Sequence, residues 1–178
     1  MRRAFSIISV FAGFAALGTL ASIGLVRAAA PAGGTDYTKV SPLDLVKQTP
    51  KGKIQDPYKD TQADIVAQGE TLFRSYSCSG CHGGTGGGGM CPAVTNDTWV
   101  YGGDDDTLFR LVTLGSDALQ AKGYMRMGME HVVGPMPPMG AIVPTDDALW
   151  KILTFVRSNY TGSAPCKFGC PVDAPPPN

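Results

Sequence analysis

The chain has 178 residues, which is enough for one small domain with terminal extensions. Its 15 basic and 15 acidic side chains cancel, and no clustered basic face of the kind that binds nucleic acid can be recognised. The 23 glycines and 14 prolines indicate a compact domain that is rich in loops.

Residues 1–30 are predicted to be a targeting segment. Arg2 and Arg3 precede an uncharged, mostly apolar run from Ala4 to Val26, and the small residue Ala28 suits cleavage by a signal peptidase. The run is also long enough to cross a bilayer. The segment is therefore expected to be either a cleaved signal peptide or a retained membrane anchor, and in both cases the rest of the chain would face the periplasm.

Residues 31–57 show little periodicity and are predicted to be an extended linker that wraps or tethers the domain. A helix is predicted from Gln62 to Tyr76, opened by a capping box formed by Thr61 and Asp64. The apolar positions of this helix recur at helical spacing and would share one face: Ile65, Gly69, Leu72, Phe73 and Tyr76.

The sequence Cys78-Ser-Gly-Cys81-His82 follows that helix directly and has the spacing of covalent haem attachment. Two thiols one helical turn apart can each form a thioether with a haem vinyl group, and His82 can then bind the iron. A redox dithiol would need a preceding strand, and a zinc site would need a second well-spaced pair of ligands. We find neither, so the sequence predicts one covalently attached haem c.

Three further cysteines, Cys91, Cys166 and Cys170, remain after the haem motif is assigned. An oxidising compartment favours a disulfide between two of them. The pairing cannot be read from the sequence, and one thiol is left over.

Residues 83–89 are all glycine except Thr85. A phosphate-binding loop is disfavoured, because no Gly-Lys-Ser/Thr sequence follows and no strand precedes. Glycines that let the backbone approach a haem edge, or that close a tightly packed loop, explain the run more simply.

A second helix is predicted from Asp105 to Leu114. Asp104, Asp105 and Asp106 stand at its start, where the helix dipole favours negative charge. Capping of the helix is therefore preferred to a metal site, although the sequence leaves calcium binding open.

The second axial ligand decides whether a haem carries electrons or binds small molecules. Met136 lies in a Gly-Pro-Met-Pro loop that cannot continue a helix, and we assign it as this ligand. Met139 is the alternative, followed by Met129 and His131.

The last helix is predicted from Asp146 to Tyr160, opened by Thr145, with an apolar stripe at helical spacing. Residues 163–178 form a tail that contains proline and cysteine and has no periodicity. Strand signals are weak throughout, so the fold is predicted to be mostly α, with residues 58–162 as a single haem domain.

This combination of motifs resembles class I c-type cytochromes, and the resemblance covers Gln62 to Tyr160. It implies that Gly69 lets the first and last helices cross closely. It also implies that an aromatic residue of the last helix, Phe155 or Trp150, packs at the crossing.

Four short sequences carry a narrower resemblance: Trp99-Val-Tyr101-Gly-Gly, Asp106-Thr-Leu-Phe109, Gly134-Pro-Met136 and Arg157-Ser-Asn-Tyr160-Thr-Gly. They are similar to sequences of cytochromes c-L, which are periplasmic electron acceptors of quinoprotein methanol dehydrogenases. The resemblance implies that Cys78 and Cys81 bind haem, that His82 is the proximal ligand and that Met136 is the distal one. It also implies that Trp99 and Tyr101 line the haem pocket.

Two features depart from these families: the segment from Ala121 to His131 looks inserted, and the extra cysteines are unusual. Both departures affect the expected redox partner more than the expected fold.

The expected function is electron transfer and not catalysis. The chain would accept single electrons from a PQQ-dependent methanol or alcohol dehydrogenase and pass them to another cytochrome or a terminal oxidase. One alternative is a membrane-anchored cytochrome subunit of a respiratory or dehydrogenase complex. Another is a haem sensor or enzyme with an open iron position.

Overall fold

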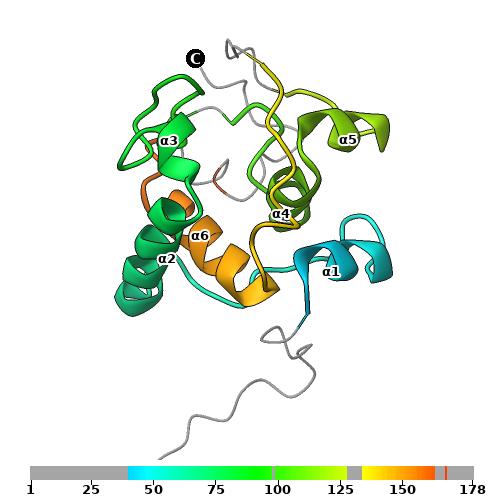
Figure 1. Ribbon diagram of the computed structural model, residues 1–178, viewed down its shortest axis with the longest axis horizontal. Helices are drawn as coiled ribbons and strands as arrows, with labels where there is room; N and C mark the ends of the chain where they lie inside the picture. Colours follow the sequence, from blue (N-terminus) through cyan, green and yellow to red (C-terminus); the bar gives the residue numbers. More distant parts are fainter. Residues whose placement is uncertain (1–39, 98, 128–133, 163–166, 168–178) are drawn as a thin grey trace, which may run out of the picture. The chain divides into compact units, whose positions relative to one another are not determined.

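The computed structural model describes residues 40–97, 99–127, 134–162 and 167, which all belong to the compact unit Gly33–Asn178 (Figure 1). This part of the chain contains helices and no strand, in agreement with the predicted mostly α fold. The helices are α1 (Pro42–Gln48), α2 (Ala63–Ser75), α3 (Cys78–His82), α4 (Asp105–Leu114), α5 (Ser116–Ala121) and α6 (Asp146–Ser158).

The last helix lies at the centre of this arrangement. Helix α6 contacts α2 on one side and α4 and α1 on the other (Figure 1). Its Trp150 is completely buried and packs on Phe109 of α4, with ring centroids 4.7 Å apart. Helix α6 therefore joins the two sides of the core.

The close crossing of α2 and α6 confirms what the resemblance implied for Gly69. A Cβ atom at this position would lie 2.0 Å from the carbonyl oxygen of Lys151 and 2.9 Å from Cβ of Phe155. Phe155 also packs against Phe73 one turn further along α2, with ring centroids 5.4 Å apart. Of the two aromatic residues considered, Phe155 is therefore the one at the crossing.

The three predicted helices agree with the observed ones to within one or two residues. Helix α4 has the predicted bounds, and the Thr145 side chain caps α6 by accepting a hydrogen bond of 3.2 Å from the Ala148 amide. The predicted capping box of α2 is wrong. The helix begins at Ala63, so Gln62 and not Thr61 occupies the capping position. The Gln62 side chain makes no cap, and its Oε1 accepts from the Lys59 amide.

The prediction that residues 31–57 are extended is wrong over α1. Ser41 caps this helix by accepting from the Asp44 amide, and Pro42 occupies its first turn, where a proline costs no hydrogen bond. Leu45 and Val46 are buried in the common core. A helix of seven residues is too short for its periodicity to be recognised in the sequence.

A buried arginine ties the end of α1 to α4. Arg110 is 5% exposed and pairs with Asp106, one turn earlier on the same helix, at 2.9 Å. Its guanidinium also donates to the carbonyl oxygens of Val46, Thr49 and Pro50. Tertiary contacts of this kind explain why α1 forms although its local sequence signal is weak.

None of the helices in the described ranges is long and apolar enough to span a membrane.

Candidate functional site

The haem-attachment sequence forms its own short helix, α3, directly after α2 (Figure 1). Ser77 separates the two helices by adopting a left-handed conformation with φ of 62°. Cys78 and Cys81 are half-buried, neither forms a disulfide, and burial raises the pKa of the Cys78 thiol. The structure thus presents both thiols on one turn, as the spacing predicted.

The imidazole of His82 is held by a main-chain carbonyl. Its Nδ1 lies 2.8 Å from the carbonyl oxygen of Pro92. A carbonyl oxygen can only accept a hydrogen bond, so Nδ1 carries a proton, and in the neutral ring the lone pair is then on Nε2. Histidines that bind metals are commonly oriented by such a bond from the other ring nitrogen. The sequence indicated His82 as a ligand but gave no sign of Pro92 as its partner.

The glycine run folds back over the haem-attachment turn. The amide of Gly88 donates to the His82 carbonyl at 2.8 Å, and the amide of Cys91 donates to the Cys81 carbonyl at 3.0 Å. Gly83 has φ of 81°, and a Cβ atom there would lie 2.4 Å from the carbonyl oxygen of Gly88. The tightly packed loop predicted as one explanation is therefore present, and it requires glycine.

Cys91 lies closer to the haem motif than the sequence suggested. Its thiol lies beside the thiol of Cys81, and burial and that neighbour both raise the pKa of the Cys91 thiol. In the described residues Cys91 forms no disulfide. Cys166 and Cys170 lie outside the described residues, so the predicted pairing of these cysteines stays a prediction.

The loop that carries the assigned distal ligand runs along the ends of α4 and α5. Met136 is half-buried, and its main-chain N and O both bond to Ser116. Met139 is also half-buried, but it packs against the hydrophobic core, and its amide donates to the carbonyl of Val112. The other two candidates, Met129 and His131, lie outside the described residues.

The two aromatic residues expected near the haem have different surroundings. Trp99 is half-buried, donates through Nε1 to the carbonyl of Val94 at 3.0 Å and packs on Tyr160 with ring centroids 4.7 Å apart. Tyr101 is buried, and its hydroxyl accepts from the Gln120 side chain at 2.9 Å. Their role in lining a haem pocket stays a prediction.

The residues around the motif fit a covalent haem. Two unpaired thiols and an imidazole whose Nδ1 is already hydrogen-bonded are the groups that hold a c-type haem. Several apolar side chains pack on the core yet stay partly exposed, as expected where a flat apolar group covers them. They include Leu72 of α2, Tyr76 directly after α2, Cys78 of α3, Val94 and Trp99 of the following loop, and Val112 and Leu114 of α4.

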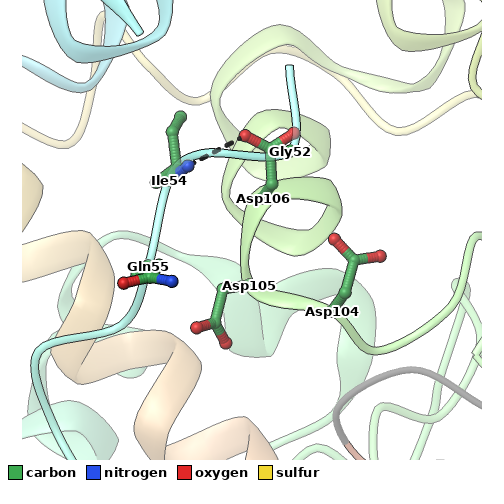
Figure 2. Close-up of a pocket in the computed structure, with 6 residues that line it drawn as sticks. All are labelled: Gly52, Ile54, Gln55, Asp104, Asp105 and Asp106. Carbon is green, nitrogen blue, oxygen red and sulfur yellow. Dashed lines mark hydrogen bonds between the residues drawn. The ribbon is translucent and has the colours of Figure 1, made fainter. Parts of the chain in front are cut away.

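The aspartate triplet caps α4 and anchors the chain. Asp104 Oδ1 accepts from the Thr107 amide at 2.9 Å, while Asp105 accepts from the Asp56 amide and Asp106 from the Ile54 amide. The three aspartates border an open hollow of about 390 Å³, in which their carboxylates point in different directions (Figure 2). The hydrogen bond from the Thr107 amide confirms the capping role of Asp104. Within the described ranges no group of three or more His, Cys, Asp or Glu side chains could hold a metal ion.

A family profile described as cytochrome C oxidase, cbb3-type, subunit III matches residues 64–156, which is slightly more than half of the chain. The matched part runs from the start of α2 almost to the end of α6, and so includes the haem motif and the Met136 loop.

Two curated relatives are described as Cbb3-type cytochrome c oxidase subunit CcoP. The protein from Rubrivivax gelatinosus is 33% identical over 101 residues, covering 56% of this chain and 27% of the relative. The protein from Cereibacter sphaeroides is 34% identical over 71 residues, covering 38% of this chain and 24% of the relative. The chain thus spans about a quarter of the length of these relatives.

Among solved structures, cytochrome CL from the marine methylotrophic bacterium Methylophaga aminisulfidivorans is similar, with 25% sequence identity and a TM-score of 0.47. The alignment covers 76% of this chain and 77% of that chain.

Proposed function

Because the chain belongs to the cytochrome c family described as cytochrome C oxidase, cbb3-type, subunit III, we propose that it is a monohaem carrier of single electrons in the periplasm. Membership of the family establishes that the chain is an electron-transfer protein with covalently bound haem c and that its fold is that of a cytochrome c.

The observation that carries the proposal is the hydrogen bond from His82 Nδ1 to the Pro92 carbonyl, 2.8 Å long, at the end of the turn that bears both free thiols. In the proposed protein Cys78 and Cys81 hold the haem through thioethers, and His82 Nε2 is the proximal ligand. The bound haem iron supplies the one-electron couple.

Met136 completes the proposed ligand set. A thioether opposite an imidazole raises the reduction potential of a haem, which suits a protein that must accept electrons. The partly exposed apolar side chains around the motif would keep water away from the group and limit the solvent reorganisation that accompanies a change of charge.

The ligand assignment is tested by the absorption spectrum of the purified holoprotein, including the weak near-infrared band that reports a bond between methionine sulfur and ferric iron. We expect the band in the wild type and in Met139→Leu, and its loss in Met136→Leu. Met139 is the matched control, because it lies three residues further along the same loop. Loss of the band in Met139→Leu alone would transfer the assignment to that residue.

Absence of the sulfur–iron band from the wild-type spectrum would support a different class of function. A wild-type spectrum without the band, together with immediate binding of carbon monoxide by the ferrous protein, would mean that one iron position is open. The chain would then be a haem sensor or enzyme instead of a carrier.

The proposed electron donor is a PQQ-dependent methanol or alcohol dehydrogenase, and the proposed acceptor is another cytochrome or a terminal oxidase. Support for the donor comes from the c-L-like sequences around Trp99, Tyr101 and Met136. Stopped-flow mixing of the oxidised protein with a reduced dehydrogenase of this class should show saturable reduction. Reduction no faster than that of an unrelated cytochrome c would exclude this donor.

A second candidate function is a fixed cytochrome subunit of a respiratory complex. The observation that favours it is the 33% identity to a protein described as an oxidase subunit. Detergent extraction separates the two candidates. A subunit would copurify with an oxidase and keep Met1, whereas a carrier would be recovered from the periplasm with a mature N-terminus near Ala29.

A further inference from the structure

Ser116, the first residue of α5, is joined to Met136 by two hydrogen bonds. The Ser116 amide donates to the Met136 carbonyl at 3.0 Å, and the Met136 amide donates to Ser116 Oγ at 3.0 Å. Ser116 is only 6% exposed, so water competes little for either bond. Ser116 thus binds both the amide and the carbonyl group of Met136.

The sequence around Met136 makes this contact unusually important for the loop. Pro135, Pro137 and Pro138 have no amide hydrogen, so the Met136 amide is the single main-chain donor between residues 135 and 138. Its one acceptor in the structure is Ser116 Oγ. If the Ser116 hydroxyl is removed, no other main-chain amide of residues 135–138 can donate a hydrogen bond in its place.

Gly115 brings the loop and α5 close enough for the bonds to form. Its φ is 78°, and a Cβ atom there would lie 2.6 Å from the Met136 carbonyl oxygen and 2.9 Å from the Pro138 nitrogen. The position therefore needs glycine both for its backbone angle and for the space. In Figure 1 the loop, drawn in yellow, passes beside α5 and the end of α4.

The loop continues along the carboxyl end of α4. The Met139 amide donates to the Val112 carbonyl at 2.9 Å, and the Gly140 amide donates to the Thr113 carbonyl at 3.0 Å. These carbonyls belong to the last turn of a helix, where carbonyl groups lack partners within the helix. The two bonds fix the far end of the loop, so Ser116 controls its remaining part, around Met136.

We infer that Ser116 is the positioning residue for the Met136 thioether. Through the paired bonds to the Met136 main chain it restricts the conformations of the loop and keeps the sulfur available to the iron. The inference rests on the proposed function, because it takes Met136 as the distal ligand. Ser116 itself contacts neither the iron nor the sulfur in this role and acts through the backbone alone.

The test is a titration of the ferric holoprotein with imidazole, which competes with the methionine sulfur for the iron. In Ser116→Ala we expect the apparent affinity for imidazole to rise roughly three- to tenfold, the effect of losing one neutral hydrogen bond. The near-infrared sulfur–iron band should weaken, and the reduction potential should fall, because a loosened thioether stabilises the ferrous state less.

Thr113→Val is the matched control. The Thr113 hydroxyl is buried near the same loop but makes no hydrogen bond within the described part of the chain, so its removal should leave imidazole affinity and reduction potential unchanged. Ser116→Thr keeps the hydroxyl and should recover most of the wild-type behaviour. If Ser116→Ala yields no holoprotein, Ser116→Cys, which replaces the hydroxyl by a slightly larger and weaker acceptor, is interpreted in the same way.

The outcomes separate this inference from the proposed function. If Met136→Leu abolishes the band but Ser116→Ala has wild-type affinity for imidazole, the ligand assignment stands and the role of Ser116 is refuted. If Met136→Leu keeps the band, the ligand assignment itself fails and the inference fails with it. An equal change in Thr113→Val and Ser116→Ala would also overturn the inference, because it would reflect general loosening of the core.

Discussion

Arg157 and Asp56 form a buried ion pair, with 2.8 Å between Nη1 and Oδ2, although 101 residues separate them in the chain. The arginine side chain is 1% exposed and the aspartate side chain 6%. The same guanidinium pairs with Asp105 at 2.5 Å and donates to the Gly103 carbonyl at 3.0 Å. The end of α6 thus holds together the segment before α2 and the start of α4.

Replacing this arginine should strongly destabilise the fold. Arg157→Met leaves the Asp56 carboxylate buried without its cation, which we expect to lower the free energy of unfolding by roughly 3–5 kcal/mol. Arg74→Met is the control, because Arg74 pairs with Glu70 at 2.6 Å on the exposed side of α2. It should cost less than about 1 kcal/mol in chemical denaturation. Equal costs would contradict the structural role of the buried pair.

The close contact of α2 and α6 gives a second prediction. In Gly69→Ala the added Cβ cannot be accommodated 2.0 Å from a main-chain oxygen, so the helices must separate. We expect a loss of at least about 2 kcal/mol in the free energy of unfolding and a lower thermal midpoint. A Cβ atom at Gly84 would meet nothing within 4 Å, so Gly84→Ala should leave the free energy of unfolding nearly unchanged. A stable Gly69→Ala variant would argue against this crossing.

The role of Asp104 can be separated from metal binding. Because its side chain caps α4, Asp104→Ala should lower the free energy of unfolding by about 1 kcal/mol. The cost should be the same with calcium present and after treatment with EDTA, since Asp105 and Asp106 are engaged with Arg157 and Arg110. Calcium-dependent thermal unfolding that is lost in the variant would support a metal site instead.

Asp146 should make stability depend on pH. This side chain is fully buried at the start of α6, its Oδ2 has no hydrogen-bond partner, and burial raises its pKa to about 6 from 3.8. The neighbouring carboxylate of Asp147, which pairs with Lys151, adds to the rise. The folded state therefore binds the proton more tightly than the unfolded state, and unfolding free energy should fall as pH rises from about 4 to about 6.

Asp146→Asn isolates this contribution, because asparagine does not titrate. The difference in unfolding free energy between wild type and variant should decrease by up to roughly 3 kcal/mol across that pH range and stay constant above it. Denaturation with urea at several pH values measures the difference. A difference that does not change with pH would show that the Asp146 carboxyl has an ordinary pKa in the folded protein.

The long amphipathic helices could be predicted because their signals are local. Apolar residues at helical spacing and the threonine or aspartate before the first turn identified α4 and α6 almost to the residue. Helices α1 and α5 were missed, since elements of seven and six residues have too few repeats to produce a pattern. The capping box of Thr61 and Asp64 failed because α2 begins at Ala63, so Gln62 and not Thr61 occupies the capping position.

The sequence by itself determined the chemistry of the site, because the two thiols and the imidazole lie within five consecutive residues and one helical turn brings them together. Only the tertiary structure decided what surrounds them. The Pro92 carbonyl beside His82, the Cys91 thiol beside Cys81 and the Ser116 bonds to Met136 all depend on how loops return to a helix end. Such contacts join residues from ten to twenty positions apart through loops without periodicity, so no local pattern records them.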